Sequence, residues 1–233
     1  MINFLIQDGS EEAIQNLEPI VEEKTLSIME LIMDGGMAGQ IIIGILFVLL
    51  FVAVYLYFER LFAIKAATHC DTNFMNKIKV SVSSGNIQAA KDLCAQQNTP
   101  VSRLTEKGIS RIGKPLEDIN TAIENAGRLE VYKLEKNVSV LATIAGAAPM
   151  IGFLGTVIGM VIAFHELASS SGQAEMGSLA AGIYTAMTTT VAGLIVGIIA
   201  YIGYNHIVVK TDKVVHQMEA TAVDFLDLLN EPT

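Results

Sequence analysis

Charge and cysteine are both scarce in this sequence, and each shortage limits what the protein can be. Only 17% of the 233 residues are charged, whereas 52% are hydrophobic. Soluble domains carry more charge than this, so the composition favours a membrane protein. The two cysteines, Cys70 and Cys94, form no CxxC pair and have no histidine at zinc-ligand spacing. We interpret them as small buried thiols and expect neither a metal site nor another cofactor.

Positive charge is also in short supply, since 15 Lys and Arg residues face 24 Asp and Glu residues, giving a net charge of −9. Nucleic-acid binding needs a basic face, so this class of partner is excluded. The first residues have no basic segment followed by a signal-peptide-like apolar run. The first membrane helix is therefore expected to act as its own insertion signal.

Motifs for enzyme chemistry are incomplete. Residues 108–115, GISRIGKP, fit most of a P-loop, but Pro115 stands where Ser or Thr would bind magnesium. His165 and Glu166 lack the second histidine of a zinc protease motif. With no nucleophile–base pair either, we expect that the protein is not an enzyme.

Three long blocks have almost no charged side chain, and they predict three membrane-spanning helices at 39–59, 137–164 and 179–205. A helix needs about 20 apolar residues to cross a bilayer core. No strand-like alternation stands out elsewhere, so the expected fold class is all-α, with long helices extending into the cytoplasm.

The distribution of Lys and Arg predicts the orientation of these spans. Segment 60–136 holds twelve of the fifteen basic residues, and the tail 206–233 holds Lys210 and Lys213. The arm 1–38 has only Lys24, and the loop 165–178 has none. We therefore expect the arm and the loop outside, and 60–136 with the C-terminus in the cytoplasm, of a multi-pass membrane protein.

The segments outside the membrane also read as helices. In the arm, an apolar stripe at helical spacing predicts an acidic amphipathic helix that lies on the lipid surface or packs on a partner; its members are Ile14, Leu17, Val21, Ile28 and Leu31. In the cytoplasmic segment we expect helices at 87–96, from Pro100 to before Gly113, and from Pro115 onward. The stripe of this last helix, which runs on into the second span, is Leu116, Ile119, Ile123, Ala126, Leu129 and Leu134.

Small residues crowd the second and third spans and predict close helix packing. The second span carries Pro149, which is expected to bend it, and Gly152, Gly155 and Gly159. In the third span, Gly193 and Gly197 share a face with Ala186 and Thr190.

Hydroxyl groups are the only polar side chains in the middle of these two spans. Thr156 lies within the glycine-rich part of the second span, and the third span carries Thr185, Thr188, Thr189 and Thr190. Such a face can pack against another helix or line a hydrated path. No Asp, Glu, Lys or Arg lies inside any span. If the protein conducts ions, another chain must supply the carboxylate on which proton and sodium pathways commonly depend.

The stretch 148–160, APMIGFLGTVIGM, closely resembles the signature aPllGLLGTVxGm of the MotA/TolQ/ExbB proton channel family. Residues 182–205, which close on Tyr204 and Asn205, resemble the second signature of that family. The resemblance implies a homopentamer around a dimer of a one-span ExbD/TolR-like partner. It also implies a partner aspartate in the pore beside Thr156 and Thr190, with Thr185 and Thr189 as further candidates for the ion pathway. The sequence departs from well-known relatives at Thr185, where those proteins carry glutamate.

Three spans and a modest length are more similar to ExbB and TolQ than to MotA. The resemblance implies a stator in the bacterial inner membrane, with the arm 1–38 and the loop 165–178 in the periplasm, that couples the proton motive force to work across the periplasm. The acidic arm favours ExbB, which energises TonB-dependent outer-membrane transport, with a TonB-like protein as a further partner. A TolQ-like role in outer-membrane integrity and a non-conducting membrane scaffold are the alternatives.

Overall fold

The computed structural model describes residues 36–68, 73–169 and 176–230, and within these ranges all regular structure is helical. The helices are α3 (Gly36–Thr68), α4 (Phe74–Ser83), α5 (Ile87–Gln97), α6 (Pro100–Ile109), α7 (Leu116–Glu135), α8 (Val138–Ser169) and α9 (Met176–Asn230). The all-α prediction is confirmed for this part of the chain. The predicted amphipathic helix in the arm 1–38 lies outside the described residues.

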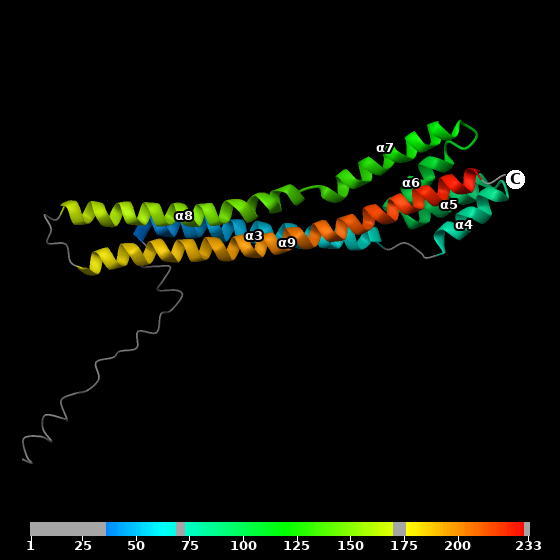
Figure 1. The fold of residues 1–233 in the computed structure, drawn as a ribbon. Helices are drawn as coiled ribbons and strands as arrows, with labels where there is room; N and C mark the ends of the chain where they lie inside the picture. The colour runs from blue at the N-terminus through cyan, green and yellow to red at the C-terminus, as the bar shows by residue number, and fades with distance from the viewer. Residues whose placement is uncertain (1–35, 69–72, 170–175, 231–233) are drawn as a thin grey trace, which may run out of the picture.

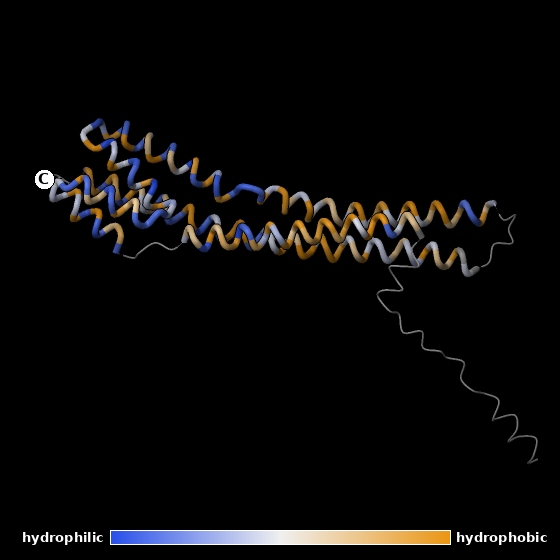
Figure 2. Tube along the Cα trace, turned by 180° about the vertical axis from the view of Figure 1, so that it is seen from behind, coloured by the Kyte–Doolittle hydropathy of each residue, from blue (hydrophilic) through white to orange (hydrophobic). Residues whose placement is uncertain are grey.

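The molecule is long and narrow, with two parts joined by α9 (Figure 1). In one part, which we call the three-helix part, α3, α8 and α9 lie side by side. In the other, the small helices α4, α5 and α6 gather with α7 around the second half of α9. Apolar residues concentrate in the three-helix part, whereas hydrophilic residues are frequent among the small helices (Figure 2).

Three helical stretches are long and apolar enough to cross a membrane, one each in α3, in α7–α8 and in α9. The helices themselves run beyond the predicted spans, because α3 has 33 residues and α9 has 55. A shared core of Leu46, Ala53, Leu141, Ala148 and Ala200 holds them together. Many other large apolar side chains point outward from the three-helix part, as they do in a protein solvated by lipid.

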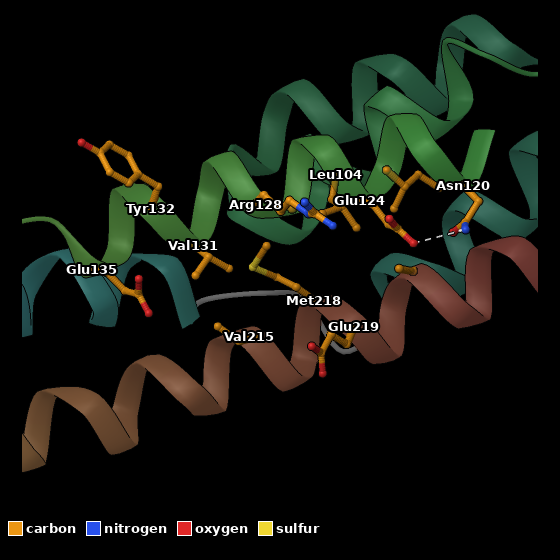
Figure 3. Close-up of a pocket in the computed structure, with 13 residues that line it drawn as sticks. Leu104, Asn120, Glu124, Arg128, Val131, Tyr132, Glu135, Val215, Met218 and Glu219 are labelled. Carbon is orange, nitrogen blue, oxygen red and sulfur yellow. Dashed lines mark hydrogen bonds between the residues drawn. The ribbon is translucent and has the colours of Figure 1, made fainter. Parts of the chain in front are cut away.

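The small helices pack on α9 through a second core that includes Ile78, Leu104, Ile123 and Phe225. Gly108 lets α6 approach α9, since a Cβ there would lie 2.5 Å from the Phe225 ring. Between α7 and α9, a groove of about 600 Å³ has apolar side chains such as Val131 and Met218 between charged ones (Figure 3).

The expected helix starts in this segment hold, because α5 begins at Ile87 and α6 at Pro100. Thr99 caps α6 by accepting a hydrogen bond from the Ser102 amide at 3.2 Å, and the Ser102 hydroxyl accepts one from the Thr99 amide at 2.9 Å. Proline in the first turn lacks only an N–H that would have no partner there.

One expectation for α7 was wrong. The helix does not continue into the second span, because Lys136 is extended and Asn137 has a positive φ of 63°. The apolar stripe lies only partly in the core: Ile119, Ile123 and Leu134 are buried, whereas Leu116 and Leu129 are exposed. The buried face instead includes Glu130, whose charge hid it from a hydrophobic pattern.

Candidate ion-pathway site between α8 and α9

Glycine and alanine bring α8 and α9 into backbone contact at several levels of the three-helix part. A Cβ at Gly152 would lie 2.8 Å from the Thr189 carbonyl oxygen, and one at Gly193 would lie 2.7 Å from the Ala148 carbonyl oxygen. Further along, a Cβ at Gly159 would lie 3.1 Å from the Ala186 methyl group. At Gly152 and Gly193 these neighbours are backbone atoms, which cannot move aside, so no larger residue fits there without separating the helices.

Pro149 takes part in the same contact. It lies inside α8, and its ring fills the space that glycine leaves at Gly197, where a Cβ would lie 2.6 Å from the proline Cγ. The close approach therefore begins at Gly197 beside Pro149 and extends past Gly159.

Thr156 and Thr190 meet across this contact, and their hydroxyl oxygens lie within hydrogen-bonding distance of each other. The Thr190 hydroxyl also donates to the Gly152 carbonyl oxygen at 3.2 Å, and the Thr156 hydroxyl lies 3.4 Å from the Ala186 carbonyl oxygen. Both side chains are half-buried. Two residues that are 34 positions apart in sequence thus form one polar group between two apolar helices.

The hydrogen-bond inventory of this threonine pair limits its chemistry. A hydroxyl has one proton to donate and two lone pairs that accept. Both protons find acceptors inside the helix pair, whereas lone pairs on the two oxygens remain. The pair can therefore accept a hydrogen bond from a water or a protonated carboxyl group, or solvate a cation, but it contains no acid or base.

Of the other predicted pathway residues, Thr189 lies closest to the threonine pair. Its side chain is fully buried against Gly155 and donates to the Ala186 carbonyl oxygen at 2.8 Å, the same oxygen that Thr156 approaches. This carbonyl links Thr189 to the threonine pair.

Thr185 and Thr188 do not join that group. Each donates to the carbonyl four residues earlier in α9, at 2.9 Å from Thr185 and 3.0 Å from Thr188. Thr185 faces the start of α3, where its methyl group would lie 2.8 Å from a Cβ at Gly39. Thr188 lines an apolar groove between α3 and α9. Of the four candidate residues, Thr156, Thr190 and Thr189 thus lie together between α8 and α9, whereas Thr185 faces α3.

Thr156 also opens onto the surface. It lines a shallow groove of about 630 Å³ on α8 together with Phe153, Val157 and Met160. Phe153 is 64% exposed and Val157 46% exposed. An apolar surface around Thr156 is suited to contact with another apolar helix that brings a polar group of its own.

Outside the three-helix part, Glu130 forms a buried ionic cluster that sequence reasoning missed. Its carboxylate accepts hydrogen bonds from Arg103 at 2.6 Å and from Lys133 at 2.7 Å. Burial by itself raises the pKa of Glu130, but the hydrogen bonds and charges of Arg103 and Lys133 outweigh it and hold that pKa below its ordinary value. The cluster joins α6 to α7 and keeps its charge near neutral pH.

Comparisons with known proteins agree on one protein family. Residues 96–220, which contain α8 and most of α9, match the MotA/TolQ/ExbB proton channel family. TolQ, a Tol-Pal system protein of Pseudomonas aeruginosa, is 24% identical over 92% of this chain and 96% of its own length. An ExbB homologue of Methanothermobacter thermautotrophicus is 31% identical over 58% of this chain and 47% of its own length. The biopolymer transport protein ExbB of Helicobacter pylori is 35% identical over 34% of this chain and 54% of its own.

The fold and these matches define a multi-pass inner-membrane protein of the proton-channel type. The chain belongs to the MotA/TolQ/ExbB proton channel family and is an ExbB/TolQ-like member of it. The chain spans about half the length of the ExbB relatives from M. thermautotrophicus and H. pylori and nearly all of the P. aeruginosa TolQ.

Proposed function

We propose that this chain is the stator subunit of an ExbB–ExbD-like motor that couples the proton motive force to work across the periplasm. Five copies surround the membrane helices of a one-span ExbD/TolR-like dimer. The arm and the 165–178 loop face the periplasm, and α4 to α7 with the end of α9 lie in the cytoplasm. The observation that carries the proposal is the Thr156–Thr190 hydroxyl pair.

The hydrogen-bond capacity of that pair supports a passive role in the ion path. Its spare lone pairs suit an incoming carboxylic acid or water, and no carboxylate lies inside the three spans of this chain. The partner aspartate therefore takes up the proton, and the threonines hold it in its neutral form. Neutralising a charge within the membrane removes a large solvation cost, which allows the partner to shift.

A variant series tests this role. Thr156→Ala and Thr190→Ala should each abolish energised transport while the complex with the one-span partner still assembles. Thr156→Ser and Thr190→Ser keep the hydroxyl and should retain transport. Thr188→Ala is the matched control, because its hydroxyl bonds within its own helix and faces the α3–α9 groove.

The outcome that contradicts the proposal is equally clear. If both alanine variants transport as well as the unaltered protein, the chain acts as a scaffold that only positions its partners. Loss of assembly in the alanine variants but not in the serine variants would likewise make the pair a packing element and not an ion site.

Two processes are candidates for the work that the motor performs. The acidic arm favours the energising of TonB-dependent outer-membrane transport, with a TonB-like protein as the third component. A TolQ-like role is the second candidate, because the P. aeruginosa TolQ matches along almost its whole length. Deleting the gene separates them: loss of TonB-dependent uptake supports the first role, and leakage of the outer membrane supports the second.

A further inference from the structure

A cavity opens at the end of the three-helix part that lies away from the small helices, which we call the distal end. Its volume is about 460 Å³, and the starts of α3 and α9 and the end of α8 form its walls. Most lining residues are small or apolar. Only two of them, Glu166 and Thr185, have polar side chains. At about 30 Å³ for each water, a space of this size can hold several water molecules.

Glu166 is the charged residue that lines this cavity. Residues 37–58, 138–169 and 176–209 make up most of the three long helices, and Glu166 is the only Asp, Glu, Lys or Arg among them. It lies three residues beyond Ala163, where α8 and α9 are still in contact, since a Cβ at Gly182 would lie 2.6 Å from the Ala163 methyl group. The carboxylate thus stands where the helix pair meets the surface.

The inner wall of the cavity lies against the hydroxyl groups described above. Gly155 lines the cavity, and its Cα packs directly on the Thr189 side chain. Thr189 donates to the Ala186 carbonyl oxygen at 2.8 Å, and Thr156 lies 3.4 Å from that same oxygen. Glu166 and Thr185 therefore line the cavity, and Thr189, which shares the Ala186 carbonyl oxygen with Thr156, lies directly behind its Gly155 wall.

We propose that this cavity is the proton entry of the motor and that Glu166 is its proton-collecting residue. The Glu166 carboxylate takes a proton from water outside and releases it to water in the cavity, so that it returns to its ionised form after each transfer. The proton then reaches the Thr156–Thr190 pair past Gly155 and Thr189. The inference rests on the proposed function, because it assigns an entrance to the same pathway.

Replacing Glu166 tests the entrance. Glu166→Gln keeps the shape and removes the titrating group, and it should lower energised transport about a hundredfold, the low end of what a positioned proton carrier contributes to a transfer rate. Glu166→Asp should retain most of the transport. Asp224→Asn, which removes an exposed carboxylate from the far half of α9, is the control and should leave transport unchanged.

A second-site variant separates a proton role from a structural one. Thr185 lines the same cavity, so Thr185→Glu should restore part of the transport lost in Glu166→Gln. The dependence of the transport rate on external pH should flatten in Glu166→Gln and return in the double variant. Copurification of the one-span partner checks that each variant assembles.

Three results would overturn the inference: unchanged transport in Glu166→Gln, an equal loss in Asp224→Asn, or a rate that follows external sodium and not pH. They are distinguishable from failure of the proposed function. If Thr156→Ala and Thr190→Ala abolish transport while Glu166→Gln does not, the motor stands and only the entrance is wrong.

Discussion

Burial controls the reactivity of single residues outside the membrane, and Cys94 gives the simplest test. Its thiol is 1% exposed within α5, and burial, with a smaller effect of the Glu106 charge, raises its pKa to about 12. At pH 8 only about one such thiol in 10⁴ is ionised, and the thiolate is the reactive form. We expect Cys94 in a Cys70→Ser variant to resist alkylation while the protein is folded and to react once a denaturing detergent unfolds it. Rapid alkylation of the folded protein, followed by mass spectrometry, would contradict this.

Glu130 is the buried carboxylate that joins α6 to α7, and its removal should be costly. Glu130→Gln leaves Arg103 and Lys133 without their charged acceptor. We expect a loss of about 2 kcal/mol in the free energy of unfolding, typical of a hydrogen-bonded charge, measured by thermal unfolding in detergent. Glu124→Gln, on the exposed side of α7, is the control and should change little.

The stabilising effect of Glu130 should depend on pH. The folded-state pKa of Glu130 is depressed, so its contribution is complete above the ordinary glutamate pKa of about 4.3 and is lost as the pH falls toward the folded value. The difference in unfolding temperature between the unaltered protein and Glu130→Gln should therefore shrink below about pH 4. A constant difference from pH 7 to pH 3 would show that the charge of Glu130 is not what stabilises the cluster.

Some of the site residues could be predicted from the sequence, and others could not. Glycines and threonines in an otherwise apolar run stand out, so the members of the α8–α9 contact could be named in advance. Their pairing could not, because which hydroxyls meet depends on the register of two helices. Glu130 was missed since its burial depends on Arg103 of another helix, and Glu166 was missed as a cavity residue since α3 closes that cavity.

At the scale of helices, close contact between α8 and α9 predicts a strong size limit at Gly193. A side chain there meets the Ala148 carbonyl oxygen and the Gly152 backbone, which cannot turn away. Gly193→Val should separate the helices and cost about 1–3 kcal/mol, the usual cost of overpacking, with less folded protein recovered from membranes. Gly146→Val is the matched control within α8, because nothing lies within 4 Å of a Cβ at that position. Equal recovery of both variants would show that this contact is not needed.

The break between α7 and α8 depends on Asn137. Its φ of 63° lies in the left-handed region, which glycine and asparagine tolerate and β-branched residues do not. We expect Asn137→Gly to behave as the unaltered protein does. Asn137→Ile should lower the midpoint of thermal unfolding or extend α7 into α8, which limited proteolysis at the break would detect as lost cleavage.

The pattern of apolar residues was sufficient to predict the helices, but it did not predict the break between α7 and α8. Runs without charge mark the three long helices, and Pro100 and Pro115 mark the starts of two short ones. Near 136–137 there is neither proline nor glycine, and the break is marked only by Asn137, which tolerates the left-handed conformation but also occurs within helices. The exposed positions of Leu116 and Leu129 follow from the same fact, because α7 turns relative to α8 and packs on α6 and α9 through another face.

At the scale of the whole molecule, apolar side chains are also exposed outside the three-helix part, where lipid would not cover them. On α7, Leu129 is 63% exposed and Tyr132 is 74% exposed, and on α9 Val223 is 57% exposed. In the proposed pentamer these side chains contact neighbouring copies. Leu129→Asp should therefore shift the purified assembly from five copies to smaller species, measured by light scattering or native mass spectrometry. Gln96→Asp on α5 adds the same charge at another exposed site and should leave five copies. An unaltered count in Leu129→Asp would place the contacts between copies elsewhere.

α9 runs without interruption from Met176 to Asn230 and belongs to both parts of the molecule. Forty residues separate Thr190 from Asn230, a distance of about 60 Å at 1.5 Å per residue. Such a rod behaves as a lever: a tilt of about 5° at the threonine would carry its far tip sideways by about 5 Å. In the proposed motor, a fluorescent label attached near Asn230 would therefore report protonation beside Thr190.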